Sequence, residues 1–315
     1  MSSKKILTIF GATGNQGGSV VNAILNSPKL SSEFGLRGIT RDANSSKAKA
    51  LASKGVELAE ANLDNAGSIK KALEGSYGVF AVTDYWITTI KEDEENQGRN
   101  IVDACIATGV KHLVWSSLPN VTKLTDGVLS NVEHFDSKAW VAEYAASKKG
   151  ESGLIVSNFM PGFFMSNLQG MIKKQENGEV ALALPFNAEE TWVPLLDIRN
   201  DTGKYVAGLF AAGKSADGVS VQGVSQWAHP KEIVSLVREI TGQDVKMEEQ
   251  PLTVEYTKQM DRIPGEMAQN MLLIRDYSYF GKGTQDRQDE SDKWLAEGTK
   301  KNTWEGFAKA NKWLQ

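Results

Sequence analysis

Residues 6–18 read Ile6-Leu7-Thr8-Ile9-Phe10-Gly11-Ala12-Thr13-Gly14-Asn15-Gln16-Gly17-Gly18. The apolar start of this stretch predicts a buried strand, and Val20, Val21, Ile24 and Leu25 follow at helical spacing. Between strand and helix, one glycine permits a tight turn, one lets the backbone approach a phosphate, and one lets the helix pack against the strand. The helix N-terminus adds free N–H groups and a partial positive charge. A turn without a ligand uses the same residues, but this position in the chain favours a dinucleotide pyrophosphate site at Gly11, Gly14 and Gly17.

The rest of the first half alternates short apolar runs with helical patterns. Strands are predicted over 36–40, 56–59, 77–83, 112–116 and 154–157, and helices over 46–53, 66–73, 96–108 and 136–148. Continuous apolar strands that alternate with helices are typical of a parallel sheet buried on both faces. We therefore expect an α/β NAD(P)-binding Rossmann fold, a doubly wound parallel sheet, with a smaller C-terminal α/β lobe.

The pattern loosens after residue 160. Helices are predicted over 202–212, 230–241, 254–260 and 303–314, and the polar segment 281–293 is interpreted as an exposed loop. We expect an NADP(H)-binding domain over 1–160 and a smaller substrate or regulatory lobe over 161–315, interleaved with the first.

Composition excludes several classes of function. The 315 residues include 35 Lys and Arg against 39 Asp and Glu, a net charge of −4, which argues against direct binding of nucleic acid. One cysteine, Cys105, and three histidines do not suit a disulfide or a metal site, and Cys105 is expected to be buried. The chain has no apolar run of membrane-spanning length and starts without a signal-peptide pattern. We expect no membrane association and a cytoplasmic protein, or a nuclear one if it is a regulator.

The end of the second strand favours NADP(H) over NAD(H). Arg41 follows Thr40 at the place where an acidic residue would hold the ribose hydroxyl of NAD, and a guanidinium suits a ribose phosphate instead. The alternatives are an arginine in a solvated loop, or Asp42 in the acidic role.

Several motifs together resemble the NmrA-like family of atypical short-chain dehydrogenases/reductases. These are the glycine stretch 10–20, the segments 82–86 and 96–98, the run His134-Phe135-Asp136-Ser137-Lys138, and the segment 161–164. The likeness covers nearly the whole chain and is greatest to the NmrA-like proteins described as NADPH sensors. It implies a Rossmann lobe, a smaller second lobe, and a cleft between them for the nicotinamide half of NADP(H).

The resemblance also implies further cofactor contacts. Thr13, Asn15 and Gln16 would join the three glycines in contacting the cofactor. Thr40, Arg41 and Lys47 would serve the phosphate and adenosine side, and Asn62 and Leu63 would flank the adenine. The nicotinamide side would be bordered by Thr83, Asp84, Tyr85, Lys138, Pro161, Gly162, Phe163 and Phe164. Asn96 stands where some relatives have a lysine, so one charge contact is expected to be missing.

A catalytic group is predicted at the first turns of the helix over 136–148. Short-chain reductases use Tyr-x-x-x-Lys, and this chain has His134-x-x-x-Lys138, which places both side chains on one helical face. Ser116 and Ser117 stand where the family has its catalytic serine. The candidate catalytic residues are therefore Lys138, His134 and Ser117. In the alternative interpretation Lys138 only anchors the cofactor ribose, and His134 is structural.

The substrate side is predicted to be apolar. Trp86, Met160, Phe163, Phe164 and Met165, with Trp192 as a further candidate, suit a flat organic substrate. The same residues would equally form a core between the lobes.

Two function classes follow from these features. The first is an NADPH-dependent oxidoreductase that reduces a small flat carbonyl or conjugated compound, with Lys138 near the nicotinamide. The second is a non-catalytic NADPH/NADP redox sensor that regulates a protein partner, and a lyase or isomerase stays open as a third. The acidic helix over 91–108 is a candidate homodimer interface.

Overall fold

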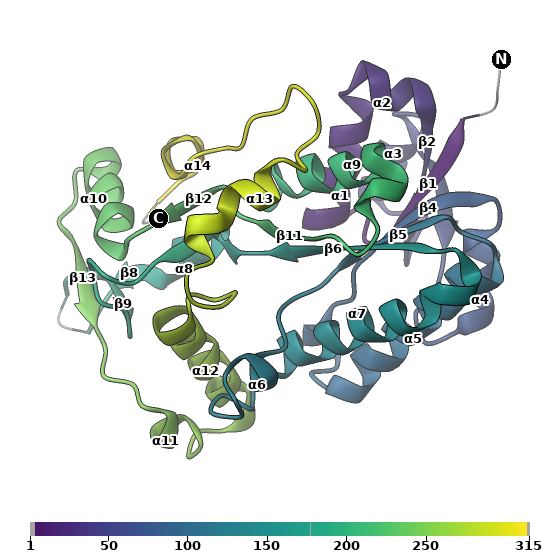
Figure 1. The fold of residues 1–315 in the computed structure, drawn as a ribbon. Helices are drawn as coiled ribbons and strands as arrows, with labels where there is room; N and C mark the ends of the chain where they lie inside the picture. Colours follow the sequence, from purple (N-terminus) through teal and green to yellow (C-terminus); the bar gives the residue numbers. More distant parts are fainter. Residues whose placement is uncertain (1–3, 177, 314–315) are drawn as a thin grey trace.

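The large sheet of the computed structural model runs through the first lobe (Figure 1). The structure describes residues 4–176 and 178–313. All seven strands of this sheet are parallel. They are β1 (Lys5–Ile9), β2 (Phe34–Thr40), β3 (Glu57–Glu60), β4 (Ser76–Ala81), β5 (His112–Ser116), β6 (Ile155–Pro161) and β11 (Ser220–Gly223). The predicted doubly wound Rossmann fold is confirmed.

The strand order places the binding crevice. It is β11-β6-β5-β4-β1-β2-β3, so the winding reverses between β1 and β4. In open α/β sheets, ligands bind beyond the carboxyl ends of the strands at this reversal. The loops that follow β1 and β4 therefore border the crevice, and both belong to the predicted cofactor site.

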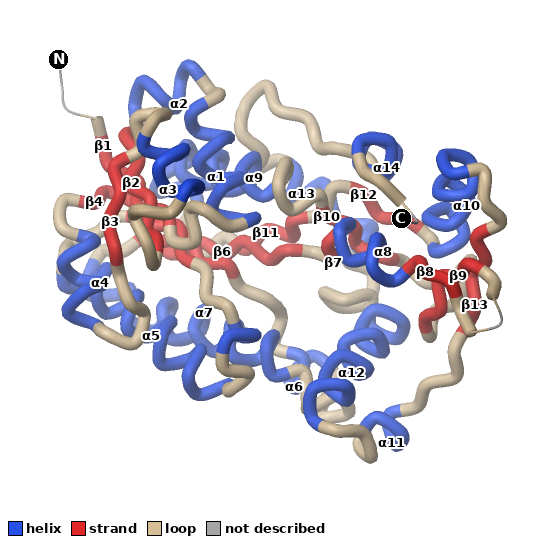
Figure 2. Tube along the Cα trace, turned by 180° about the vertical axis from the view of Figure 1, so that it is seen from behind, coloured by secondary structure: helices blue, strands red, loops and turns tan. Residues whose placement is uncertain are grey.

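Helices cover both faces of the sheet (Figures 1 and 2). One face carries α1 (Asn15–Leu25), α2 (Pro28–Glu33), α3 (Ser46–Ala52) and α9 (Thr202–Ala212). The other carries α4 (Ala66–Leu73), α5 (Lys91–Ala107) and α7 (Glu133–Ser152), and the short α6 (Val121–Leu124) packs beside α7. Apolar side chains from sheet and helices form a separate core on each face.

A glycine lets α5 and α7 approach closely. A Cβ at Gly98 of α5 would overlap the side chain of Val141 in α7. This contact holds the N-terminal halves of both helices together, and Glu94 and Lys138 lie in those halves.

The second lobe contains two small three-stranded sheets. The first consists of β7 (Phe163–Phe164), β10 (Val193–Leu196) and β12 (Gln226–Ala228), and the second of β8 (Ile172–Lys174), β9 (Val180–Leu184) and β13 (Val245–Glu249). Its helices are α8 (Met165–Met171), α10 (Pro230–Thr241), α11 (Val254–Thr257), α12 (Arg262–Tyr277) and α14 (Trp304–Ala310). The described residues also form the 3-10 helices η1 (Tyr85–Ile87), η2 (Gly213–Ala216) and η3 (Gln285–Arg287). Because α9 and β11 follow residue 161 but pack in the first lobe, the two lobes are interleaved.

The expectation of an exposed loop over 281–293 was wrong. This segment contains η3 and α13 (Gln288–Asp292), which lies along β11 at the sheet edge (Figures 1 and 2). Ser291 Oγ accepts a hydrogen bond from the backbone N–H of Gln222 at 2.9 Å, and Gln288 Nε2 donates to the Gln222 carbonyl at 3.1 Å. The polar residues of this segment thus bind the open edge of a sheet. A polar sequence alone does not show whether its side chains bond to a sheet edge or to solvent.

Two other expectations about elements also differ from the structure. The sixteen-residue helix α12 was not predicted, and the helix expected over 254–260 ends at Thr257. The last residue of the helix expected over 303–314 lies outside the described residues.

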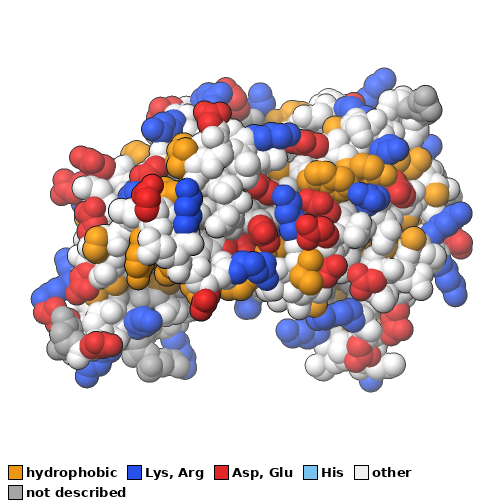
Figure 3. Space-filling model, turned by 90° about the horizontal axis from the view of Figure 1, so that it is seen from below, with side chains coloured by type: hydrophobic (Ala, Val, Ile, Leu, Met, Phe, Trp, Pro, Cys, Tyr) orange, Lys and Arg blue, Asp and Glu red, His pale blue; other side chains and the backbone are white. Residues whose placement is uncertain are grey.

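The surface carries charges of both signs. Acidic and basic side chains alternate over the face seen in Figure 3. Within residues 4–176 and 178–313, no helix has the length and apolar character needed to cross a membrane.

Candidate functional site

The loop after β1 forms a cradle with little side-chain cover. Gly11 has a φ of +60°, and a Cβ at Gly17 would overlap the Gly11 carbonyl. Gly14 is the N-cap of α1 and has no side chain to accept a hydrogen bond from the first turn. Among the described residues, no side chain caps these N–H groups, so they are available to an anion.

Side chains around this cradle are held by neighbours. Gln16 Oε1 accepts from Ser116 Oγ at 2.7 Å, which ties the glycine loop to the end of β5. Asn15 Oδ1 accepts from Arg199 Nε at 2.9 Å. Arg199 lies between β10 and α9, so the chain brings a cation from beyond residue 160 to the start of α1.

The predicted adenosine contacts lie after β2 and β3. The buried Thr40 hydroxyl bonds to the backbone of Asp42, whereas Arg41 and Lys47 are exposed. Asn62 Oδ1 accepts from the N–H of Asp64 at 3.0 Å, and the Leu63 carbonyl accepts from Asn100 Nδ2 at 2.9 Å. These two strands end at the same edge of the sheet as β1, as the prediction requires.

Lys138 belongs to a buried polar cluster around Glu94. The Glu94 carboxylate, 1% exposed, accepts from Thr83 Oγ1 at 2.7 Å and forms short contacts with Ser137 Oγ and Lys138 Nζ. The charge of the Lys138 ammonium is therefore matched by a buried carboxylate. An ammonium has three N–H groups, so Lys138 keeps donors for a further partner.

Ser116 and Ser117 lie beside this cluster and are both buried. Ser117 Oγ lies 3.4 Å from the Lys138 carbonyl and 3.3 Å from that of Leu118, and Ser116 bonds to Gln16. The two serines connect the glycine loop to the helix that carries Lys138.

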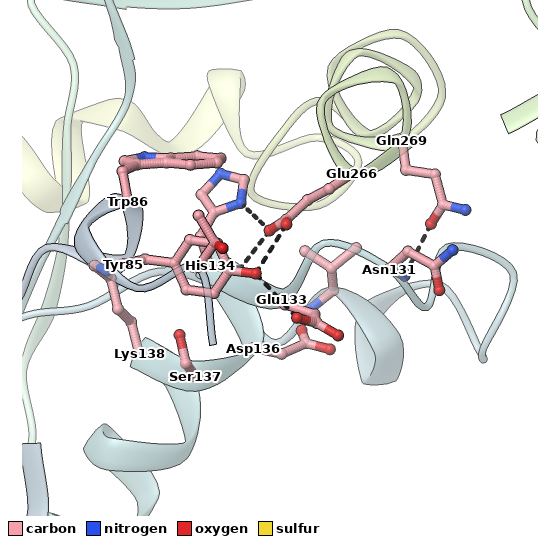
Figure 4. A network of polar contacts seen from close by, with 12 residues as sticks. Tyr85, Trp86, Asn131, Glu133, His134, Asp136, Ser137, Lys138, Glu266 and Gln269 are labelled. Carbon is pink, nitrogen blue, oxygen red and sulfur yellow. Dashed lines mark hydrogen bonds and ion pairs between the residues drawn. The ribbon is translucent and has the colours of Figure 1, made fainter. Parts of the chain in front are cut away.

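A second network joins the lobes (Figure 4). His134, in the first turn of α7, donates to Glu266 Oε1 of α12 through its backbone N–H at 2.8 Å and through Nδ1 at 2.6 Å. The Tyr85 hydroxyl lies 2.9 Å from Glu266 Oε2 and 2.9 Å from Glu133 Oε2. Arg262 also contacts Glu133 and the Tyr85 hydroxyl, each at 3.1 Å.

The protonation states in this network follow from its surroundings. Burial and the hydrogen bonds to Glu133 and Glu266 raise the pKa of Tyr85, so it donates as a neutral phenol. Burial alone would raise the pKa of Glu266, but the hydrogen bonds from His134 outweigh it, and the pKa lies below its usual value. Glu266 is therefore a carboxylate at neutral pH.

The predicted substrate-side residues divide into two groups. Trp86 is 45% exposed and lies 4.9 Å, centroid to centroid, from the His134 ring (Figure 4). Met165 was expected on the substrate side but is fully buried in the core of the second lobe, where Phe163 also packs. Met160 and Phe164 are half-buried against the cores. Met165 and Phe163 are therefore core residues, and Trp86 is the most exposed of the predicted substrate-side residues.

The remaining predicted residues border the same edge. Asp84 is exposed and accepts from the N–H of Trp86 at 3.2 Å. The Pro161 carbonyl accepts from Tyr279 at 3.2 Å. Gly162 donates to the Gly223 carbonyl at 2.9 Å, and a Cβ there would overlap the Pro194 carbonyl.

Sequence reasoning missed the polar partners of the predicted residues. Glu94 is one of four consecutive acidic residues, and nothing in that run marks it as the buried one. Glu266 and Arg262 lie on the helix that was not predicted, and Arg199 was not among the predicted site residues. In the described part of the chain, no group of three His, Cys, Asp or Glu is arranged to hold a metal ion.

The fold and the glycine cradle together define a Rossmann-type nucleotide-binding protein. The chain belongs to the NmrA-like family, whose model matches residues 3–308. The predicted family is therefore confirmed.

Three relatives illustrate the range of this fold. The NmrA-like family domain-containing oxidoreductase malD of Malbranchea aurantiaca is 34% identical over 258 residues, covering 78% of this chain and 75% of malD. The structure of NmrA, a negative transcriptional regulator, has a TM-score of 0.75 at 18% identity and covers 98% of this chain and 95% of its own. NmrA has also been solved in complex with NADP. The triphenylmethane reductase of Citrobacter sp., complexed with NADP(H), has a TM-score of 0.70 at 18% identity and covers 97% of this chain and 99% of its own.

Proposed function

We propose that this chain is an NADPH-dependent oxidoreductase that reduces a small flat carbonyl or conjugated compound. The observation that carries the proposal is the link from the glycine cradle through Ser116 and Ser117 to Lys138. This link brings a phosphate-binding loop and a buried ammonium to one edge of the sheet. The name of malD as an oxidoreductase and the NADP(H) complex of the Citrobacter reductase support the same function.

The residues present fit NADP(H). The N–H groups at the start of α1 suit the pyrophosphate, and a side chain at Gly17 would overlap the backbone of Phe10 and Gly11 and so distort the loop that presents them. Arg41, directly after β2, and Lys47, at the start of α3, are exposed cations and suit the ribose phosphate. Thr83, Asp84, Tyr85 and Lys138 would border the nicotinamide ribose.

When bound, NADPH would supply the hydride. Lys138 would hold the ribose hydroxyls with the N–H groups that Glu94 does not take, and Glu94 would keep the ammonium in place. The exposed ring of Trp86 would stack on a flat substrate.

A panel of flat carbonyl compounds tests the reductase. NADPH should be oxidised in the presence of menadione, phenanthrenequinone or benzaldehyde, as followed by its absorbance. Lys138→Ala should lower turnover by about a hundredfold or more, because the ribose that orients the nicotinamide would lose its anchor. Lys148→Ala, an exposed lysine on the same helix, is the matched control. Full turnover in Lys138→Ala would contradict the role of Lys138, and no oxidation with any compound would contradict the reductase.

A second proposed function, an NADPH/NADP sensor, rests on the network between the lobes. Tyr85 lies in the loop that would border the nicotinamide and bonds directly to Glu266 of the second lobe. A change at the nicotinamide would therefore reach α12 through a single hydrogen bond. Limited proteolysis and sedimentation should then differ between the NADPH-bound and NADP⁺-bound protein, and identical results would contradict the sensor.

A further inference from the structure

Two polar side chains on one face of α7 are held by different carboxylates. Lys138 pairs with Glu94, which also accepts from Thr83 and Ser137. His134, one turn earlier, is bonded through Nδ1 to Glu266. Any role of these side chains in a reaction depends on what their partners leave free.

The imidazole of His134 is held in one orientation. Glu266 is 1% exposed, and its Oε1 accepts from both the backbone N–H and Nδ1 of His134. Since the carboxylate can only accept, Nδ1 must carry the proton. Among the residues that the structure describes, Nε2 has no hydrogen-bond partner.

Aromatic rings complete the setting. Trp86 lies 4.9 Å and Phe135 4.8 Å from the imidazole, centroid to centroid, and the side chain of His134 is 12% exposed. The free edge of the ring therefore lies beside the exposed Trp86, where the proposed flat substrate would stack (Figure 4). A carboxylate that fixes the tautomer of a histidine and stabilises its cation is the arrangement used for proton transfer in hydrolase triads.

We propose that His134 is the proton donor of the reduction and that Glu266, from the second lobe, is its positioning residue. This inference rests on the proposed reductase function. Hydride adds to the carbonyl carbon of the substrate, and the electron pair of the C=O bond moves to the oxygen. That oxygen takes the Nε2 proton of the imidazolium, which leaves an alcohol and a neutral ring still bonded to Glu266 through Nδ1–H. Solvent then restores the proton on Nε2.

Glu266 and the neighbouring Glu133 provide a matched pair of variants. Both carboxylates bond to the Tyr85 hydroxyl, but only Glu266 contacts His134. With benzaldehyde as substrate, Glu266→Gln should lower kcat by about tenfold or more, because the amide keeps the geometry and loses the charge. Glu133→Gln should change kcat by less than about threefold, since Glu133 is only half-buried and does not contact His134. NADPH affinity, measured by fluorescence, should stay within about twofold in both variants.

A double variant tests whether the two residues act as one unit. His134→Gln should lower kcat at least as much as Glu266→Gln, and His134→Gln/Glu266→Gln should lose no more than His134→Gln alone. A further loss in the double variant, or full kcat in Glu266→Gln, would overturn the proposal.

A readout without cofactor or substrate separates this inference from the proposed function. The chain has three histidines, so the ring nitrogens can be resolved by NMR of histidine-labelled protein. The neutral His134 ring should carry its proton on Nδ1 in the wild type and in Glu133→Gln, and on Nε2 in Glu266→Ala. An unchanged tautomer in Glu266→Ala would overturn the positioning role even if turnover is found. If NADPH binds but no compound in the panel is reduced, the reductase and the donor role both fail, whatever the tautomer.

Discussion

Glu94 and Glu266 are equally buried and each accepts three hydrogen bonds, but they join different parts of the molecule. All donors to Glu94 belong to the first lobe, so Lys138 is held within the Rossmann unit. Glu266 belongs to the second lobe, and its donors are His134 and Tyr85 of the first. As a result, the position of Lys138 on α7 depends on its own lobe, and the position of His134 depends on how the two lobes meet.

Removing Glu94, the partner of Lys138, should destabilise the protein more than any other change considered below. Glu94→Ala leaves a buried ammonium uncompensated and should lower the free energy of unfolding by about 3–5 kcal/mol. Urea denaturation measures this. Glu92→Ala, an exposed residue of the same acidic run, should cost no more than about 0.5 kcal/mol. Equal stability of Glu94→Ala and wild type would mean that the cluster does not hold the first lobe together.

His112 also makes the free energy of unfolding depend on pH, and this contribution must be known before the two carboxylates are compared in acid. Burial lowers the pKa of His112, in β5, from 6.5 to about 4. The unfolded chain therefore takes up a proton first as the pH falls. The free energy of unfolding therefore keeps its full value above pH 6.5. It decreases between pH 6.5 and about 4, by up to about 3 kcal/mol.

A variant of His112 checks this contribution. His112 Nε2 lies 2.8 Å from Ser157 Oγ, and Ser157 donates to the Ala216 carbonyl, so Nε2 is the donor. His112→Gln preserves such a donor without the titration and should flatten the loss of unfolding free energy over this pH range. An unchanged slope in that variant would assign the acid sensitivity to other groups.

His112 is buried in its neutral form, whereas Glu266, at the contact between the lobes, is buried as a carboxylate. Glu266→Gln should cost about 1–3 kcal/mol of unfolding free energy at neutral pH, because charge-assisted bonds are lost. The pKa of Glu266 is lowered in the folded state, so its contribution is complete above its ordinary value of 4.5 and is lost as the pH falls through the lowered value. The difference between wild type and Glu266→Gln, measured by urea denaturation, should therefore shrink in acid. A difference that stays constant with pH would indicate a loss of packing and not of charge.

Arg199, between β10 and α9, donates a hydrogen bond to Asn15 at the start of α1. Removing this contact should change cofactor affinity only slightly. Arg199→Gln should raise the Kd for NADPH by about three- to tenfold, because one exposed charge beside the proposed pyrophosphate site is removed. Fluorescence titration at low and high salt measures this, and the difference should narrow at high salt. Arg287→Gln, far along the chain in η3, is the control. An affinity unchanged by Arg199→Gln would restrict the phosphate site to residues of the first lobe.

The sequence predicted the first lobe well because its signals are local. The strand around Ile9 and the glycines that follow it obey rules that need no knowledge of distant residues. Lys138 could be predicted from its spacing to His134, since four residues make one helical turn. The structure has not tested the roles of these residues, which stay predictions.

The partners of these residues could not be predicted because they are distant in the chain. His134 and Glu266 are 132 positions apart. The pair Pro264-Gly265 in the first turn of α12 conceals that helix, because proline and glycine usually mark turns. In the same way, the polar residues of α13 look like a solvated loop until β11 is seen beside them.

The position of α13 also sets the order in which the protein can be completed during synthesis. The sheet edge at Gln222 receives its hydrogen bonds from residues 66 and 69 positions later. Until residues 288–292 have left the ribosome, β11 presents unpaired backbone groups that another chain can bind. Residues 288–292 therefore cover this edge of the sheet only late in synthesis, and chains shortened before α13 should aggregate rather than fold into a free first lobe.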